Sequence, residues 1–142
     1  MMEYRKGLIG MLILANIIVA GYLAYTEVFC VEPFCLTGGG CKIVQNSEYG
    51  SILGIKLGVV GIIGFFALFL SYILAYKKKI DYKIYLTMSF IGALGAIYFI
   101  SLQFFVIKAV CSNCMAVDFN AILIFLISYY DFKKSLRERA SR

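Results

Sequence analysis

Four long apolar runs alternate with short polar segments along the chain. The runs cover roughly residues 7–25, 52–76, 84–107 and 114–132. As helices rising about 1.5 Å per residue, each can cross the roughly 30 Å hydrocarbon layer of a membrane. Because backbone groups in lipid must find hydrogen bonds within the protein, runs of this length predict helices. The pattern therefore predicts an all-α integral membrane protein, a single domain over residues 1–142 built as a four-transmembrane-helix bundle.

Composition supports this interpretation, since 62% of the 142 residues are apolar and only 15% are charged. Soluble domains carry about 25% charged residues, and a soluble core of this size could not bury four such helices. A cleaved signal peptide is the alternative for the first run, because basic residues precede it. That run is longer than a usual signal core, and no clear A-x-A cleavage site follows it.

Positive charge is concentrated on one predicted side of the membrane. Lysine and arginine lie before the first run, between the second and third, and after the fourth, so four crossings put them on the same side. Short basic segments stay in the cytoplasm. We therefore expect a multi-pass protein of the plasma membrane with both termini cytoplasmic. The net charge of +6 reflects this orientation, and no basic patch interleaved with aromatic residues predicts nucleic-acid binding.

The largest segment outside the predicted spans is the outer loop, residues 26–51, which we expect on the extracytoplasmic side. It contains a run of three glycines at 38–40, which can adopt backbone angles closed to other residues. The tail of the loop places Ile43 and Val44 among polar neighbours. This pattern predicts a short interfacial helix lying on the membrane surface.

All the cysteines lie on the predicted outer side or at its rim. They are Cys30, Cys35, Cys41, Cys111 and Cys114. Disulfides persist outside the cytoplasm, so four of these residues suit two dithiol/disulfide pairs. For the three loop cysteines alone, a structural disulfide that clamps the loop is the simpler interpretation.

Cys111 and Cys114 form a C-x-x-C pair at the predicted start of the fourth helix. Free N–H groups at a helix start lower the pKa of nearby thiols, and thiolates are the reactive species. A disulfide that closes so short a loop adds little to stability, so the pair predicts redox activity. A four-sulfur zinc site with Cys35 and Cys41 is the alternative. The wide spacing of the loop pair and an oxidising compartment count against it, and we predict no metal.

Asp118 follows the C-x-x-C pair inside the fourth apolar run. Positions 111, 114 and 118 are spaced three and four apart, so they share one face of a helix. An acid within a membrane span is costly and usually functional. We expect Asp118 to serve an apolar oxidant, such as a membrane quinone, docked against Cys114. The alternative is that Asp118 pairs with Lys56 across the bundle and only stabilises it.

Together these residues resemble the vitamin K epoxide reductase family, in its bacterial and archaeal branch. The resemblance covers nearly the whole chain and rests on four spans and three short motifs. These are "CLTGGGC" at 35–41 with Ser47 six residues later, "SILG" at 51–54 and "CSNC" at 111–114. The resemblance implies a four-helix bundle around a quinone, with the C-x-x-C pair beside it and a loop helix as a lid.

The resemblance also implies an order of thiol exchange. Cys114 would face the quinone, and Cys111 would be its exchange partner. Cys41 would attack the Cys111–Cys114 disulfide, and Cys35 would pass oxidation to an outside substrate. Cys30 has no role in this scheme, and it is either a free thiol or a partner of Cys35.

The candidates on the quinone side are Ser47, Tyr49, Lys56 and Asp118. Two positions depart from the animal enzymes, in which the residues that contact the quinone carbonyls are an asparagine and a tyrosine. Gly50 stands where the asparagine precedes the start of span two, and Asp118 stands in place of the tyrosine. The identity of the quinone, of the menaquinone or ubiquinone type, is therefore left open.

The function that follows is a membrane thiol oxidase that makes disulfides. Many bacterial members carry a fused thioredoxin-like domain, which these residues do not contain, so we expect a separate secreted or periplasmic thioredoxin-like partner. The rival class is a non-enzymatic four-span protein with structural disulfides, either a soft-metal binder or a small transporter. An exporter of cations should place an acid in its first span, where the predicted run offers only Asn16.

Overall fold

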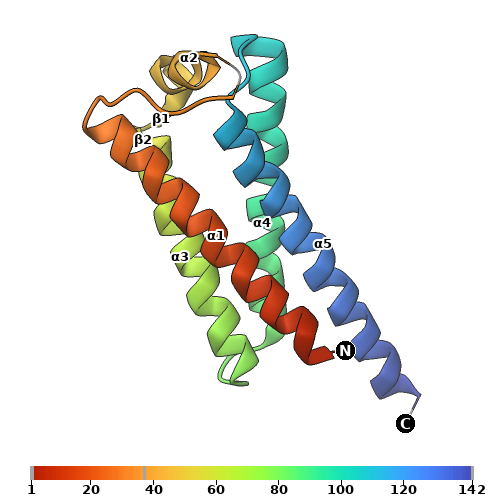
Figure 1. The fold of residues 1–142 in the computed structure, drawn as a ribbon. Helices are drawn as coiled ribbons and strands as arrows, with labels where there is room; N and C mark the ends of the chain where they lie inside the picture. The colour runs from red at the N-terminus through yellow and green to blue at the C-terminus, as the bar shows by residue number, and fades with distance from the viewer. Residues whose placement is uncertain (1, 37, 142) are drawn as a thin grey trace.

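The computed structural model describes residues 2–36 and 38–141 of the chain. Four long helical segments form a bundle (Figure 1). They are α1 (Met2–Val28), α3 (Leu57–Tyr76), α4 (Tyr82–Ser101) with its π-helical continuation η2 (Leu102–Ile107), and α5 (Ser112–Ala140). By length and composition all four can cross a membrane, which confirms the predicted all-α architecture.

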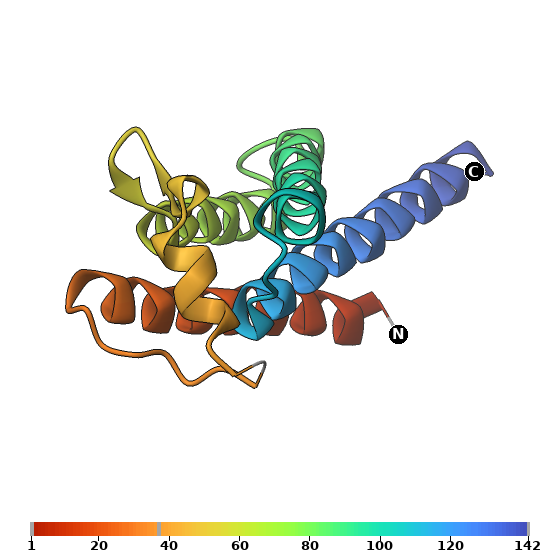
Figure 2. The same ribbon diagram turned by 90° about the horizontal axis from the view of Figure 1, so that it is seen from above.

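Neighbouring helices in the bundle form a closed ring of contacts. Helix α1 packs against α3 and α5, and α4 also packs against α3 and α5. Both chain termini lie at one end of the bundle, together with the short α3–α4 turn (Figure 1). The C-terminal part of α5 extends beyond the other helices (Figures 1 and 2). The basic segments of the sequence therefore gather at the end opposite the loop that contains the cysteines.

The outer loop and residues 52–56, which follow it, fold into short elements across the other end of the bundle (Figure 2). These elements are α2 (Gly40–Asn46), the 3-10 turn η1 (Glu48–Gly50) and the strands β1 (Ser51–Ile52) and β2 (Ile55–Lys56). Helix α2 begins directly after Gly39, whose φ of 94° is open to glycine and strained for other residues. The predicted short helix in the tail of the loop is therefore present.

The second span begins later than the apolar run predicts. Strands β1 and β2 pair antiparallel, with Ser51 opposite Lys56 and Ile52 opposite Ile55. The two turn residues, Leu53 and Gly54, have positive φ angles of 53° and 82°, as in the primed turns that join two-residue hairpins. Because these angles interrupt a helix, the "SILG" motif is a hairpin and α3 starts at Leu57.

A close approach of two helices explains one glycine of the second span. A Cβ atom at Gly58 would lie 2.6 Å from the backbone nitrogen of Ala24 and 2.9 Å from Oε2 of Glu27. The backbone N–H of Gly58 also donates to that Glu27 oxygen at 2.9 Å. Helices α1 and α3 therefore meet through backbone atoms at this level, as small residues allow in membrane bundles.

Asn16 connects α1 to α5 by hydrogen bonds. Its side chain is only 2% exposed and donates to the carbonyl of Val117 at 3.3 Å. Its Oδ1 accepts from the amide of Asn120 at 2.8 Å. The observed α1 is longer than the predicted run and also contains Glu27, so Asn16 is not the only polar residue that this span offers.

Candidate functional site

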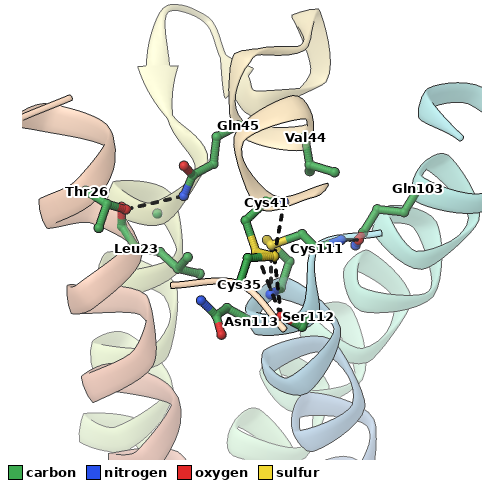
Figure 3. The surroundings of a disulfide bond; sticks show 12 residues. Leu23, Thr26, Cys35, Cys41, Val44, Gln45, Gln103, Cys111, Ser112 and Asn113 are labelled. Atoms are coloured by element: carbon green, nitrogen blue, oxygen red, sulfur yellow. Dashed lines mark hydrogen bonds between the residues drawn. A yellow bond between two sulfur atoms is a disulfide. The ribbon is translucent and has the colours of Figure 1, made fainter. Parts of the chain in front are cut away.

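Two disulfides lie side by side where the loop meets the start of α5. One joins Cys35 to Cys41, with Cα atoms 5.9 Å apart, and the other joins Cys111 to Cys114, with Cα atoms 5.2 Å apart. Cys41 and Cys111 are both completely buried and belong to one cluster with Val44 of α2 (Figure 3). The fold thus brings together four cysteines from segments about seventy residues apart.

The fifth cysteine stands apart from this arrangement. Cys30 is exposed and has a free thiol, so its alternative pairing with Cys35 is wrong in this structure. Across residues 2–36 and 38–141, no group of three or more histidine, cysteine or acidic side chains is arranged to hold a metal ion.

The C-x-x-C pair is held by the end of the preceding helix. Lys108, at a positive φ of 54°, ends the π-helical segment, and the chain then turns to begin α5. Gln103 is 2% exposed, and its Oε1 accepts from the backbone N–H of Cys111 at 2.8 Å. The Cys111 sulfur in turn accepts from the backbone N–H of Cys114 at 3.2 Å and caps the helix. Gln103 therefore fixes the position of the pair.

The loop that contains Cys35 is fastened by polar side chains of α1 and α5. The N–H of Phe34 donates to the Tyr22 hydroxyl at 2.9 Å, and the Phe34 carbonyl accepts from the Asn113 amide at 2.9 Å. The N–H of Leu36 donates to the Ser112 hydroxyl at 3.1 Å. Two of these three anchors are the residues between the C-x-x-C cysteines.

An exposed ion pair joins Glu32, which precedes the loop disulfide in the sequence, to Lys42, which follows it. Lys42 donates to Glu32 at 2.5 Å. This hydrogen bond and the opposite charge lower the pKa of Glu32 and raise the pKa of Lys42. Because both side chains are exposed, the pair adds little to the stability of the loop.

The position that departs from the animal enzymes at the start of span two lacks room for a side chain. A Cβ atom at Gly50 would lie 2.2 Å from the carbonyl oxygen of Gln45. Gln45 itself is buried and donates to the Thr26 hydroxyl of α1 at 3.4 Å. An asparagine at position 50 would therefore displace the turn that follows α2.

A cavity of about 400 Å³ lies between the four long helices and reaches α2 and η1. Most of its lining is apolar, with contributions from every long helix, including Leu23, Phe65, Met88 and Phe99. Its polar lining residues are Glu27, Tyr49, Gln103, Cys114 and Asp118. The C-x-x-C pair therefore borders both the loop disulfide and an apolar cavity between the helices.

Asp118 is an acidic residue in the mostly apolar lining of this cavity. Its Oδ2 is buried and, within the part of the chain that the structure describes, has no hydrogen-bond partner. No ion pair joins it to Lys56 among the described residues, so the alternative of a stabilising pair is wrong in this structure. Lys56 is the residue before α3 and is not among the residues that line the cavity.

The other predicted residues are divided between the cavity and the surface. Tyr49 lines the cavity with Cys114 and Asp118, whereas Ser47 and Lys56 do not. The Ser47 hydroxyl donates to the carbonyl of Val44 at 2.6 Å and ends α2. It also lines a separate surface hollow of about 540 Å³, beside η2.

Four residues of the site were not predicted from the sequence. They are Glu27, Gln103, Ser112 and Asn113. The amide of Gln103 inside an apolar run was a usable signal, because polar groups in membrane spans are costly unless they have a partner. Ser112 and Asn113 gave no such signal, since small polar residues are common at helix starts.

The fold and the site define a membrane protein with two adjacent disulfides, one facing the loop and one facing a cavity between the helices. Residues 7–129 match the model of the Vitamin K epoxide reductase family, and the chain belongs to this family. A comparison with curated proteins finds no match. Family membership makes the protein a membrane oxidoreductase of disulfide bonds.

Proposed function

We propose that the protein is a thiol oxidase that makes disulfides in a thioredoxin-like partner and passes the electrons to a membrane quinone. The observation that supports this most directly is the shared burial of Cys41 and Cys111 in one cluster. Cys35 of the loop packs against that cluster, and Cys114 lines the cavity. The four sulfurs thus form a series from the aqueous loop to the apolar interior.

Oxidation of the partner begins at the loop pair. A thiolate of the partner attacks the Cys35 sulfur, the Cys35–Cys41 bond breaks, and the electron pair goes to the Cys41 sulfur as a thiolate. The second thiol of the partner then attacks its own mixed disulfide with Cys35, loses its proton to water and releases the Cys35 thiolate. The partner leaves with a disulfide, and the loop pair is reduced.

The second exchange moves the electrons from the loop to α5. The Cys41 thiolate attacks Cys111, the Cys111–Cys114 bond breaks, and Cys114 becomes a thiolate. The Cys35 thiolate then attacks Cys41, which restores the loop disulfide and leaves Cys111 reduced. The burial of Cys41 and Cys111 together supports this direct exchange, since it needs no other carrier between them.

The cavity fits a quinone by its chemistry. Its walls are largely apolar, and Cys114 and Asp118 both line it. The buried Oδ2 of Asp118 has no partner among the described residues, so a polar group of a ligand can satisfy it. A bound quinone would supply an acceptor for two electrons and two protons. The Cys111 and Cys114 thiols together would give up both as their disulfide re-forms, and Asp118 would hold or donate a proton beside Cys114.

The distribution of positive charge supports an extracytoplasmic location for these exchanges. The basic segments lie at the end of the bundle opposite the cysteines, and such segments stay in the cytoplasm. The thioredoxin-like partner is therefore a secreted or periplasmic protein, and both termini of the chain are cytoplasmic. No electron or charge has to cross the whole membrane in this scheme.

A direct test uses the purified full-length protein in detergent with a reduced thioredoxin-like protein and an added quinone. We expect the quinone absorbance to fall in proportion to the disulfides formed in the partner. Cys30→Ala is the matched control, because that thiol lies outside both pairs. Tight binding of metal in proportion to protein, with no quinone reduced, would contradict the proposal and favour the metal-binding class.

A further inference from the structure

The Ser112 hydroxyl contacts both sulfurs of the loop disulfide, although it belongs to the C-x-x-C motif. Its Oγ lies 3.5 Å from the Cys35 sulfur and 3.9 Å from the Cys41 sulfur. The same oxygen accepts the backbone N–H of Leu36 at 3.1 Å. These interactions meet where the start of α5 touches the loop (Figure 3). One side chain thus joins the two redox pairs.

The hydrogen bonds that the Ser112 hydroxyl already accepts determine which further bond it can donate. Because Oγ already accepts from Leu36, its own proton is available to donate, and the two loop sulfurs lie within reach. A sulfur in a disulfide is a weak acceptor, whereas a thiolate is a charged and stronger one. The contact therefore gains strength when the loop pair is reduced.

We propose that Ser112 is a further catalytic residue of disulfide exchange, whose hydroxyl donates a hydrogen bond to the loop sulfur that becomes a thiolate. This inference rests on the proposed function. When the partner attacks Cys35 and the electron pair goes to Cys41, the hydroxyl donates to the Cys41 thiolate. Once the partner has left, it donates to the Cys35 thiolate before that sulfur attacks Cys41. Ser112 keeps its proton throughout, so the balance of each exchange is unchanged.

The location of the hydroxyl couples thiolate stabilisation to docking of the loop. The backbone N–H of Cys41 already donates to the Cys35 sulfur at 3.2 Å and moves with the loop. Ser112, in contrast, belongs to α5 and can act only while the loop lies against it. The thiolate of the Cys35–Cys41 pair is thus stabilised when the loop lies beside the Cys111–Cys114 disulfide, which accepts its electrons.

Asn113 offers a matched comparison on the same turn of α5. Its amide donates to the Phe34 carbonyl at 2.9 Å and so fastens the same loop. That bond is to the backbone and places no donor on a reacting sulfur. Removing it should loosen docking, whereas removing the Ser112 hydroxyl should weaken docking and also destabilise the thiolate.

The test measures thiolates without any quinone or partner. The background is the full chain with Cys30→Ala, Cys111→Ser and Cys114→Ser, so that only Cys35 and Cys41 titrate after reduction. Ultraviolet thiolate absorbance is followed against pH in this background and with Ser112→Ala, Ser112→Thr or Asn113→Ala added. Melting temperatures of the same samples report whether each variant is folded.

We expect Ser112→Ala to lower the thiolate fraction at neutral pH about tenfold, the factor given by one hydrogen bond to a charged group. Ser112→Thr should restore it, and Asn113→Ala should change it less. An unchanged titration in Ser112→Ala would overturn the inference, and so would an equal change in Asn113→Ala. A failure of the proposed function would look different. The unmutated protein would then reduce no quinone, while the thiolate titration of Cys35 and Cys41 would still change in Ser112→Ala.

Discussion

Buried polar groups toward the two ends of the bundle include two with opposite surroundings, Tyr85 and Asp118. At the end that holds the termini, the buried Tyr85 hydroxyl meets the Ser128 hydroxyl at 2.8 Å, and Arg5 pairs with Asp131. At the end that holds the cysteines, the Oδ2 of Asp118 has no partner in the described residues and faces a cavity. A buried polar group without a partner costs about 1–3 kcal/mol. This difference between Tyr85 and Asp118 supports the proposal that the cavity beside Asp118 binds a ligand.

The largest effect expected at the cavity end is that of Cys114→Ala. Without this sulfur the disulfide that borders the cavity cannot form, so we expect quinone reduction to fall to the uncatalysed rate. The measurement is the rate of quinone absorbance loss with a reduced thioredoxin-like protein. Normal turnover in this variant would remove Cys114 from the proposed electron path.

Cys35→Ala separates the loop pair from the cavity end. We expect this variant to fail on a protein substrate, because no loop sulfur remains for the partner to attack. A small apolar dithiol that reaches Cys114 through the cavity should still be oxidised. The two substrates are compared by the rate of quinone reduction. Equal loss on both would instead indicate that the loop disulfide is only structural.

The same substitution can be made at both ends, as Asp118→Asn and Asp131→Asn. If Asp118 gives acid–base help at the quinone, Asp118→Asn should slow quinone reduction by about 10² to 10⁴, and the melting temperature should change little. Asp131→Asn should do the reverse, with turnover kept and about 1 kcal/mol or less of stability lost with the Arg5 ion pair. Both quantities are measured on each variant. Wild-type turnover in Asp118→Asn would exclude the carboxyl from the reaction.

The smallest expected effect is a loss of stability at the end of the bundle that holds the termini. Tyr85→Phe removes the hydroxyl that contacts Ser128 and leaves the aromatic ring in place. The Ser128 hydroxyl still donates to the carbonyl of Ile124 at 2.7 Å, so we expect a loss of only about 1 kcal/mol. Thermal unfolding checks the size of the loss. A change in turnover as large as that of Asp118→Asn would contradict the separation of the two ends.

The number of spans and the short loop helix could be predicted from the sequence, because apolar length and local polarity determine them. The start of the second span could not. Ile52, Leu53 and Ile55 are as apolar as a helix interior, and only the turn angles show that they form a hairpin. Within the candidate site, the C-x-x-C pair and Asp118 were predictable because they lie on one helix.

Contacts between distant segments were the part that the sequence could not supply. The alternative pair of Asp118 and Lys56 is absent from the described residues because the hairpin leaves Lys56 outside the cavity. Ser112 and Asn113 acquire their importance only because the loop folds back onto α5. Sequence spacing within one helix cannot report such contacts, which depend on how separate elements meet.

The complete burial of Cys41 and Cys111 also bears on how the protein avoids wasteful side reactions. Thiol exchange requires an in-line approach to a sulfur, so a sulfur that solvent cannot reach is kinetically inert toward dissolved thiols. Small reductants in water therefore reach Cys35 before the buried Cys41 and Cys111, whatever the reduction potentials of the buried sulfurs are. Access rather than driving force then fixes the sequence of exchanges, and Cys41 and Cys111 are shielded from the dissolved thiols around the loop.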